Sequence, residues 1–157
     1  MIYIIKKIGF LFLTILLVSF LVGAQTTTFN LVWLSSVDMP VSLGVLISSV
    51  YHDFLLMTLT PAPPLPLPLL PTIIALGFLI AFSFTWLVLL WVKVQKRIAY
   101  GIAGAIALVL IVYLMPLVFF GIDMLAGART TVGKIILILC GYIGGHFFGT
   151  RLSKEQI

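Results

Sequence analysis

Residues able to do acid–base, nucleophilic or metal chemistry are few in this chain and widely spaced. Two histidines, four carboxylates and one cysteine stand at His52, His146, Asp38, Asp53, Asp123, Glu155 and Cys140. Neither histidine has an HExxH-type spacing or a third ligand nearby, and a single cysteine cannot form an internal disulfide or a cysteine-based metal cluster. No glycine-rich phosphate loop or Ser-His-Asp set is visible. We therefore expect no catalytic site, no metal and no cofactor.

The composition explains why chemistry is scarce. Of the 157 residues 62% are hydrophobic and only 8% are charged, whereas a soluble domain usually carries about a quarter charged residues. So little polar surface cannot cover so large an apolar fraction in water, so lipid is the expected surrounding of the fold. The net charge of +5 comes from cations at the ends of apolar runs and not from a basic stripe, so we expect no nucleic-acid partner.

Four apolar runs have the length of about 17–25 helical residues that a bilayer requires. They cover residues 8–24, 72–92, 99–121 and 132–150 of a single membrane domain, 1–157. With the N-terminus in the cytoplasm, seven of the nine Lys and Arg residues fall on the inner side, and Arg129 and Lys134 fall outside. The pattern predicts an all-α integral membrane protein with four transmembrane helices and both termini in the cytoplasm.

Residues 25–71 are expected to form an outer segment with three parts. Residues 25–34 alternate partly and are rich in Thr, Val and aromatics, which predicts a short extended segment. The apolar stretch 41–59 is interrupted by His52 and Asp53, and a carboxylate at mid-membrane costs about 3 kcal/mol or more. We expect an interfacial or re-entrant helix there, and Asp38, His52 and Asp53 are the candidate polar residues of the outer segment as a whole. A fifth span with His52 and Asp53 buried against neighbours is the alternative. Six prolines within 61–71 favour a stiff polyproline spacer over a docking motif.

Small residues gather in the last two spans. Gly141, Gly145 and Gly149 recur every four residues with Gly144 beside them, and this spacing lets another helix approach closely in lipid. The third span has its own small residues at Gly101, Gly104, Ala105 and Ala107. We expect spans three and four to form a tight antiparallel hairpin. Contact with a partner protein or with a second copy is the alternative use of this glycine face.

The first 24 residues allow two interpretations. Lys6 and Lys7, an apolar stretch and the small residues 22–24 resemble a secretory signal with a cleavage point. The same pattern is typical of a membrane anchor, and we expect the segment to be retained.

Two stretches, Leu21-Val-Gly-Ala-Gln-Thr-Thr-Thr-Phe-Asn-Leu-Val-Trp-Leu34 and Asp38-Met-Pro-Val-Ser-Leu-Gly-Val45, resemble the front of the lipopolysaccharide assembly protein A family of bacterial inner-membrane proteins. The basic run Trp91–Arg97 is similar to that family's helix-end basic run. The resemblance covers about a third of the chain; here a proline-rich segment intervenes, and two further spans replace the family's soluble tail. It implies a non-enzymatic adaptor in a bacterial inner membrane.

These observations together predict a small accessory, scaffold or adaptor subunit of a membrane protein assembly, with membrane lipids and other membrane-protein subunits as partners. The alternative is a small oligomeric channel or transporter, which a water-filled path lined by Ser83, Thr85 or His146 would favour. A membrane enzyme ranks third, and a cofactor beside His52 or His146 would raise it.

Overall fold

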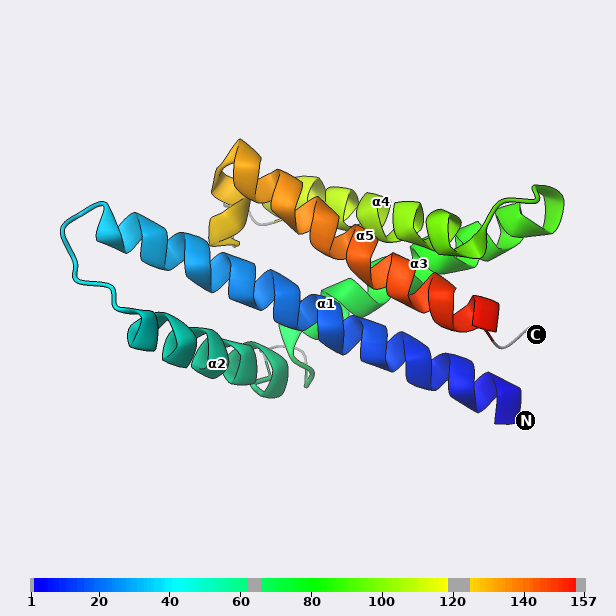
Figure 1. Cartoon of the computed structure of the whole chain (residues 1–157), viewed down its shortest axis with the longest axis horizontal. Helices are drawn as coiled ribbons and strands as arrows, with labels where there is room; N and C mark the ends of the chain where they lie inside the picture. The colour runs from blue at the N-terminus through cyan, green and yellow to red at the C-terminus, as the bar shows by residue number, and fades with distance from the viewer. Residues whose placement is uncertain (1, 62–65, 119–124, 155–157) are drawn as a thin grey trace.

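The computed structural model describes residues 2–61, 66–118 and 125–154, and these are almost entirely helical, with no strand among them. Five α-helices and one short 3₁₀ helix follow one another along the chain (Figure 1). Their bounds are α1 Ile2–Ser35, α2 Leu43–Leu59, α3 Leu69–Trp91, α4 Lys96–Val118, η1 Ala126–Arg129 and α5 Thr131–Lys154.

The prediction of four membrane-spanning helices is confirmed at the level of length and composition. Within the described residues α1, α3, α4 and α5 are long and apolar enough to cross a membrane, whereas α2 is shorter, at 17 residues. The chain is thus a membrane protein by the character of its helices. The helix ends differ from the predicted ones, most of all in α1, whose 34 residues span about 51 Å against a hydrocarbon core of about 30 Å.

The predicted extended segment at 25–34 was wrong, because these residues continue α1 without interruption. The hydroxyl of Thr28 donates to the carbonyl of Ala24 one turn earlier, at 2.7 Å, which satisfies a polar group within the helix. Thr26 and Thr27 are buried against the rest of the fold. Tertiary contact therefore outweighs the preference of β-branched residues for strands.

The chain reverses after α1 in a turn centred on Asp38. Asp38 has φ 62°, a left-handed conformation that aspartate tolerates better than most residues, and the Met39 amide donates back to the Leu34 carbonyl at 3.3 Å. The hydroxyl of Ser42 then accepts from the Val45 amide and caps the start of α2. The stretch predicted as an outer helix at 41–59 is thus helical from Leu43.

α2 runs back along the second half of α1, and α3 then continues in the same direction as α2 (Figure 1). α2 contains no buried residue and packs mainly on α1, with a smaller contact to α3. The centre of the proline-rich link, residues 62–65, lies outside the described residues. Because α2 and α3 point the same way, they do not alternate as two consecutive crossings would.

The core lies where α1, α3, α4 and α5 meet. Its largest fully buried side chains come from all four helices: Val18, Ile74, Phe78, Leu108 and Leu137. Nearer the termini an aromatic cluster joins α3, α4 and α5, with the rings of Phe82 and Phe148 stacked at 4.8 Å and Tyr100 edge-on to both. The two chain ends lie at the same end of the bundle (Figure 1).

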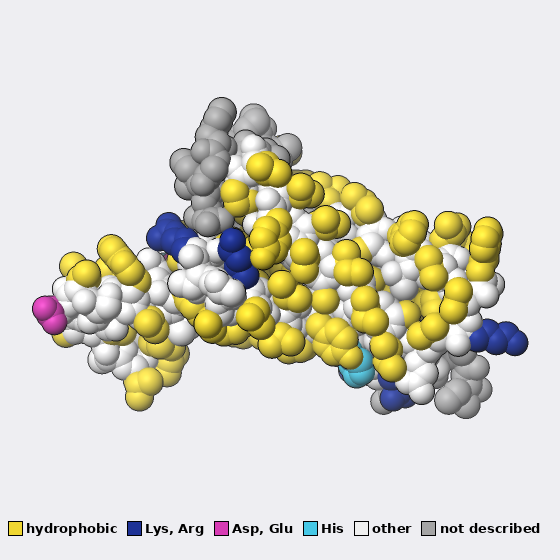
Figure 2. All heavy atoms as spheres, turned by 90° about the horizontal axis from the view of Figure 1, so that it is seen from above, with side chains coloured by type: hydrophobic (Ala, Val, Ile, Leu, Met, Phe, Trp, Pro, Cys, Tyr) yellow, Lys and Arg dark blue, Asp and Glu magenta, His cyan; other side chains and the backbone are white. Residues whose placement is uncertain are grey.

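The outside of the bundle is apolar. Figure 2 shows hydrophobic side chains covering most of this face, with the Lys and Arg side chains gathered on either side of the apolar middle of the bundle. Large apolar side chains such as Phe12, Ile80, Ile106 and Leu139 are half or more exposed. Such a surface suits a hydrocarbon surrounding and not water.

Candidate functional site

The glycine face of α5 lies directly against α4. A Cβ on Gly141 would overlap the carbonyl oxygen of Gly104, and a Cβ on Gly104 would overlap that of Gly141. One turn further, a Cβ on Gly145 would overlap the carbonyl of Tyr100, and at Gly149 it would meet the backbone of Lys96 and Arg97. The two backbones are therefore as close as glycine permits, in a geometry that favours weak Cα–H···O contacts.

The remaining small residues serve other contacts. Gly144 faces α1, where a Cβ would overlap the Val18 side chain, and Gly101 is covered by the ring of Tyr142. Ala105 is half-buried, whereas Ala107 is buried and approaches α3 at Gly77. The small residues thus divide between three interfaces, α4 with α5, α5 with α1, and α4 with α3.

The three polar residues predicted for the outer segment do not converge on one site. Asp38 forms the turn after α1, and His52 is exposed on α2. Asp53 is half-buried, and its Oδ2 accepts a hydrogen bond from the hydroxyl of Thr27 on α1 at 2.8 Å. Phe20 and Phe54 pack edge to face beside this bond, with their centroids 5.3 Å apart. Asp53 therefore fastens α2 to α1.

A buried polar cluster that we did not predict from the sequence lies next to this contact. The amide nitrogen of Gln25 donates to the carbonyl of Gly133 at 3.3 Å, and the Thr26 hydroxyl lies 3.5 Å from the Gln25 amide oxygen. Gly127 in η1 leaves the space that the Gln25 side chain occupies. Gln25 and its partner Gly133 are 108 positions apart in sequence. The one sequence signal for this cluster was therefore the polar run Gln25–Thr28 within an apolar stretch.

No arrangement among the described residues has the form of a catalytic or metal centre. No group of three or more His, Cys, Asp or Glu residues lies close enough there to hold a metal ion. His146 is exposed on α5 with its ring 6.0 Å from that of Tyr142, and Cys140 is a buried free thiol. Asp123 and Glu155 lie outside the described residues.

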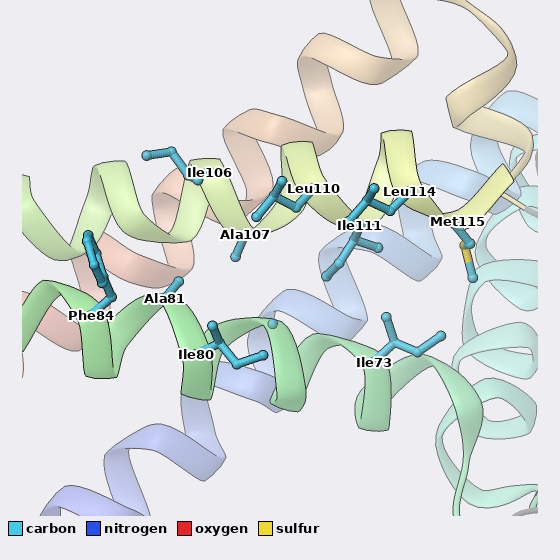
Figure 3. A pocket seen from close by; sticks show the side chains of 11 residues that line it. Ile73, Ile80, Ala81, Phe84, Ile106, Ala107, Leu110, Ile111, Leu114 and Met115 are labelled. Carbon is cyan, nitrogen blue, oxygen red and sulfur yellow. The ribbon is translucent and has the colours of Figure 1, made fainter. Parts of the chain in front are cut away.

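An apolar groove of about 580 Å³ runs between α3 and α4 on the side of the bundle. Figure 3 shows Ile73 and Phe84 of α3 pointing toward α4, and Ala107 and Ile111 of α4 pointing toward α3. Its lining contains no charged side chain, and it opens between residues that are exposed on the outer surface. Chemically the groove can take hydrocarbon and little else.

Comparison of the chain with protein-family models, with curated proteins and with solved structures finds no match. The resemblance of residues 21–45 and 91–97 to the lipopolysaccharide assembly protein A family stays a prediction.

Proposed function

We propose that the chain is a small non-catalytic accessory, scaffold or adaptor subunit of a membrane protein assembly. Its N- and C-termini face the cytoplasm, because seven of nine cations belong to the end of the bundle where α1 and α4 begin and α3 and α5 end. They are Lys6, Lys7, Lys93, Lys96, Arg97, Arg151 and Lys154. Placement in a bacterial inner membrane rests on the family resemblance alone.

The observation that carries this proposal is a two-helix projection, which we call the arm and define as residues 28–59. The C-terminal end of α1 and the first part of α2 extend beyond the ends of α4 and α5 (Figure 1). Apolar side chains on the arm remain exposed, Trp33 by 60%, Ile47 by 67% and Tyr51 by 62%. Exposed apolar patches of this kind mark contact with protein or membrane, because their exposure to water is unfavourable.

The depth of the arm in the membrane is inferred from the polar residues at and just before its base. From Lys7 to Gln25 α1 rises about 27 Å, close to the thickness of the hydrocarbon core. Gln25, Thr26, Thr27 and Asp53 would then mark the outer boundary, with Arg129 at the same level because η1 packs on Gln25. The end of α2 beside Phe20 would dip into the outer leaflet as a re-entrant segment, and the tip of the arm would stand outside.

The alternative of an oligomeric channel would need polar side chains lining a water-filled path, and the described residues show no such arrangement within the chain. Ser83 and His146 are exposed on different helices, and the Thr85 hydroxyl donates to the carbonyl of Ala81 in its own helix at 2.8 Å. The buried polar side chains Thr14, Ser19, Gln25, Thr26 and Thr27 all belong to α1. An ion pathway needs polar groups from facing helices at membrane depth.

Site-specific photocrosslinking in native membranes tests the accessory role. We expect a photoreactive residue at Trp33 or Ile47 to give a discrete adduct with another membrane protein. The controls are Leu139 and Ile143, which are equally apolar and about half exposed on the bundle. Adducts of equal yield from both sets, or none from the arm, would contradict the proposal. Solute flux through liposomes carrying the purified chain would favour a channel.

A further inference from the structure

Two adjoining cavities open at the end of the bundle that carries both termini. Their volumes are about 300 and 210 Å³, and both are lined by Lys7 of α1, Trp86 of α3, Tyr100 of α4 and Leu152 of α5. All four long helices therefore contribute residues to one site.

The lining joins apolar side chains to cations. The larger cavity is bounded by Leu11, Leu79, Phe82 and Phe148, and the smaller one by Leu89 and Leu90. Lys7 borders both cavities and Lys96 borders the smaller one. A ligand that fits both parts must carry a negative charge next to a hydrocarbon chain.

Among the described residues, those around the cavities carry positive charge. Lys6, Lys93, Arg97 and Arg151 belong to the same end, and the guanidinium of Arg151 lies 5.1 Å from the ring centre of Phe147. The carboxylates of the described residues, Asp38 and Asp53, belong to the arm. Lys7 and Lys96 each also have an interaction within the chain; an ammonium group has three donors, so a further acceptor can bind as well.

We propose that these cavities bind an anionic phospholipid of the adjacent leaflet, with its phosphate beside Lys7 and Lys96 and an acyl chain against Leu11 and Leu79. Basic pockets between transmembrane helices are suited to lipid phosphates, and Trp86 is a residue type favoured at the membrane surface. A free phosphate would gain nothing from the leucine and phenylalanine lining. The proposal is independent of the accessory role.

The test compares two double variants that remove the same charge from the same end. Lys7→Gln/Lys96→Gln removes the cations of the cavities, whereas Lys6→Gln/Lys93→Gln removes neighbouring cations that do not line them. Binding of phosphatidylglycerol to the purified full chain is measured by native mass spectrometry in mild detergent. At about 1 kcal/mol for each lysine, the first variant should bind about 30-fold more weakly, and the second should change affinity less than about threefold.

Three results would overturn the proposal. They are equal losses in both double variants, equal affinity of the native chain for phosphatidylcholine and phosphatidylglycerol, and displacement of the lipid by millimolar inorganic phosphate. The last two measurements use the native chain, so they decide the matter even if Lys7→Gln/Lys96→Gln does not fold. Preference for phosphatidylglycerol that weakens as salt is raised supports the proposal.

Discussion

At the scale of single residues, the glycines of α5 set the distance between two backbones. Adding one methyl group at Gly145 would force the Tyr100 carbonyl away, and backbone cannot rotate aside as a flexible side chain can. We expect Gly145→Ala to lower the free energy of unfolding by about 1–3 kcal/mol, the usual cost of overpacking. Thermal unfolding in detergent measures the change.

Gly9 supplies the matched control, because it is a helical glycine of α1 with nothing within 4 Å of an added Cβ. Gly9→Ala should stabilise the protein by about 0.5–1 kcal/mol, since alanine loses less backbone entropy in a helix. The two identical changes thus have opposite expected signs. A rise in melting temperature for both would show that close packing at Gly145 is not needed.

The sequence alone predicted the α4–α5 contact far better than the contacts of the polar residues just before the arm. Glycines four residues apart have a direct geometric meaning on a helix, so the spacing of Gly141, Gly145 and Gly149 is enough to assign them to one face. Gln25 and Thr27 could not be assigned in this way, because their partners Gly133 and Asp53 are distant in sequence. Without those partners, the local pattern of Thr and aromatic residues indicated a strand.

Among the α-helices, α2 packs least against the rest of the fold. It buries no residue completely, and the Thr27–Asp53 hydrogen bond and the Phe20–Phe54 ring contact are two of its contacts with α1. Thr27→Val keeps the shape but removes the bond, at a cost of about 1 kcal/mol or more, so α2 should open about fivefold more often. Hydrogen exchange of residues 43–59 measures this opening.

Thr28→Val is the control for this prediction. The Thr28 hydroxyl bonds within its own helix, to the Ala24 carbonyl, so its loss should leave exchange in α2 unchanged. Exchange in α5 should stay constant in both variants. Equal acceleration of α2 in Thr27→Val and Thr28→Val would mean that the bond to Asp53 does not hold the arm together.

The sequence predicted which segments are membrane-spanning helices better than it predicted where those helices end. The four spans followed from apolar length, because a bilayer fixes how many residues a helix needs to cross it. The extension of α1 to Ser35 did not follow, since the partners of its polar residues, Asp53 for Thr27 and Gly133 for Gln25, are distant in sequence. The 17 residues of α2 were recognised as an apolar stretch, but its alignment along α1 is a tertiary property.

In the molecule as a whole, the distribution of charge and the shape define the same long axis. The cation-rich end carries both termini and the proposed lipid site, and the arm projects from the opposite end (Figure 1). The bundle between them is apolar outside and packed by small residues inside. This difference between the two ends supports the proposal that the chain crosses the membrane four times and presents different surfaces on the two sides.

The most direct measurement of that claim is thiol labelling in intact cells, in a chain where Cys140 is replaced by serine. Ser36→Cys places a thiol near the tip of the arm, and Gln95→Cys places one between α3 and α4; both positions are exposed. A membrane-impermeant reagent should label the first thiol in intact cells and the second only after permeabilisation. Labelling of both thiols in intact cells, or of Gln95→Cys alone, would contradict the four-span account.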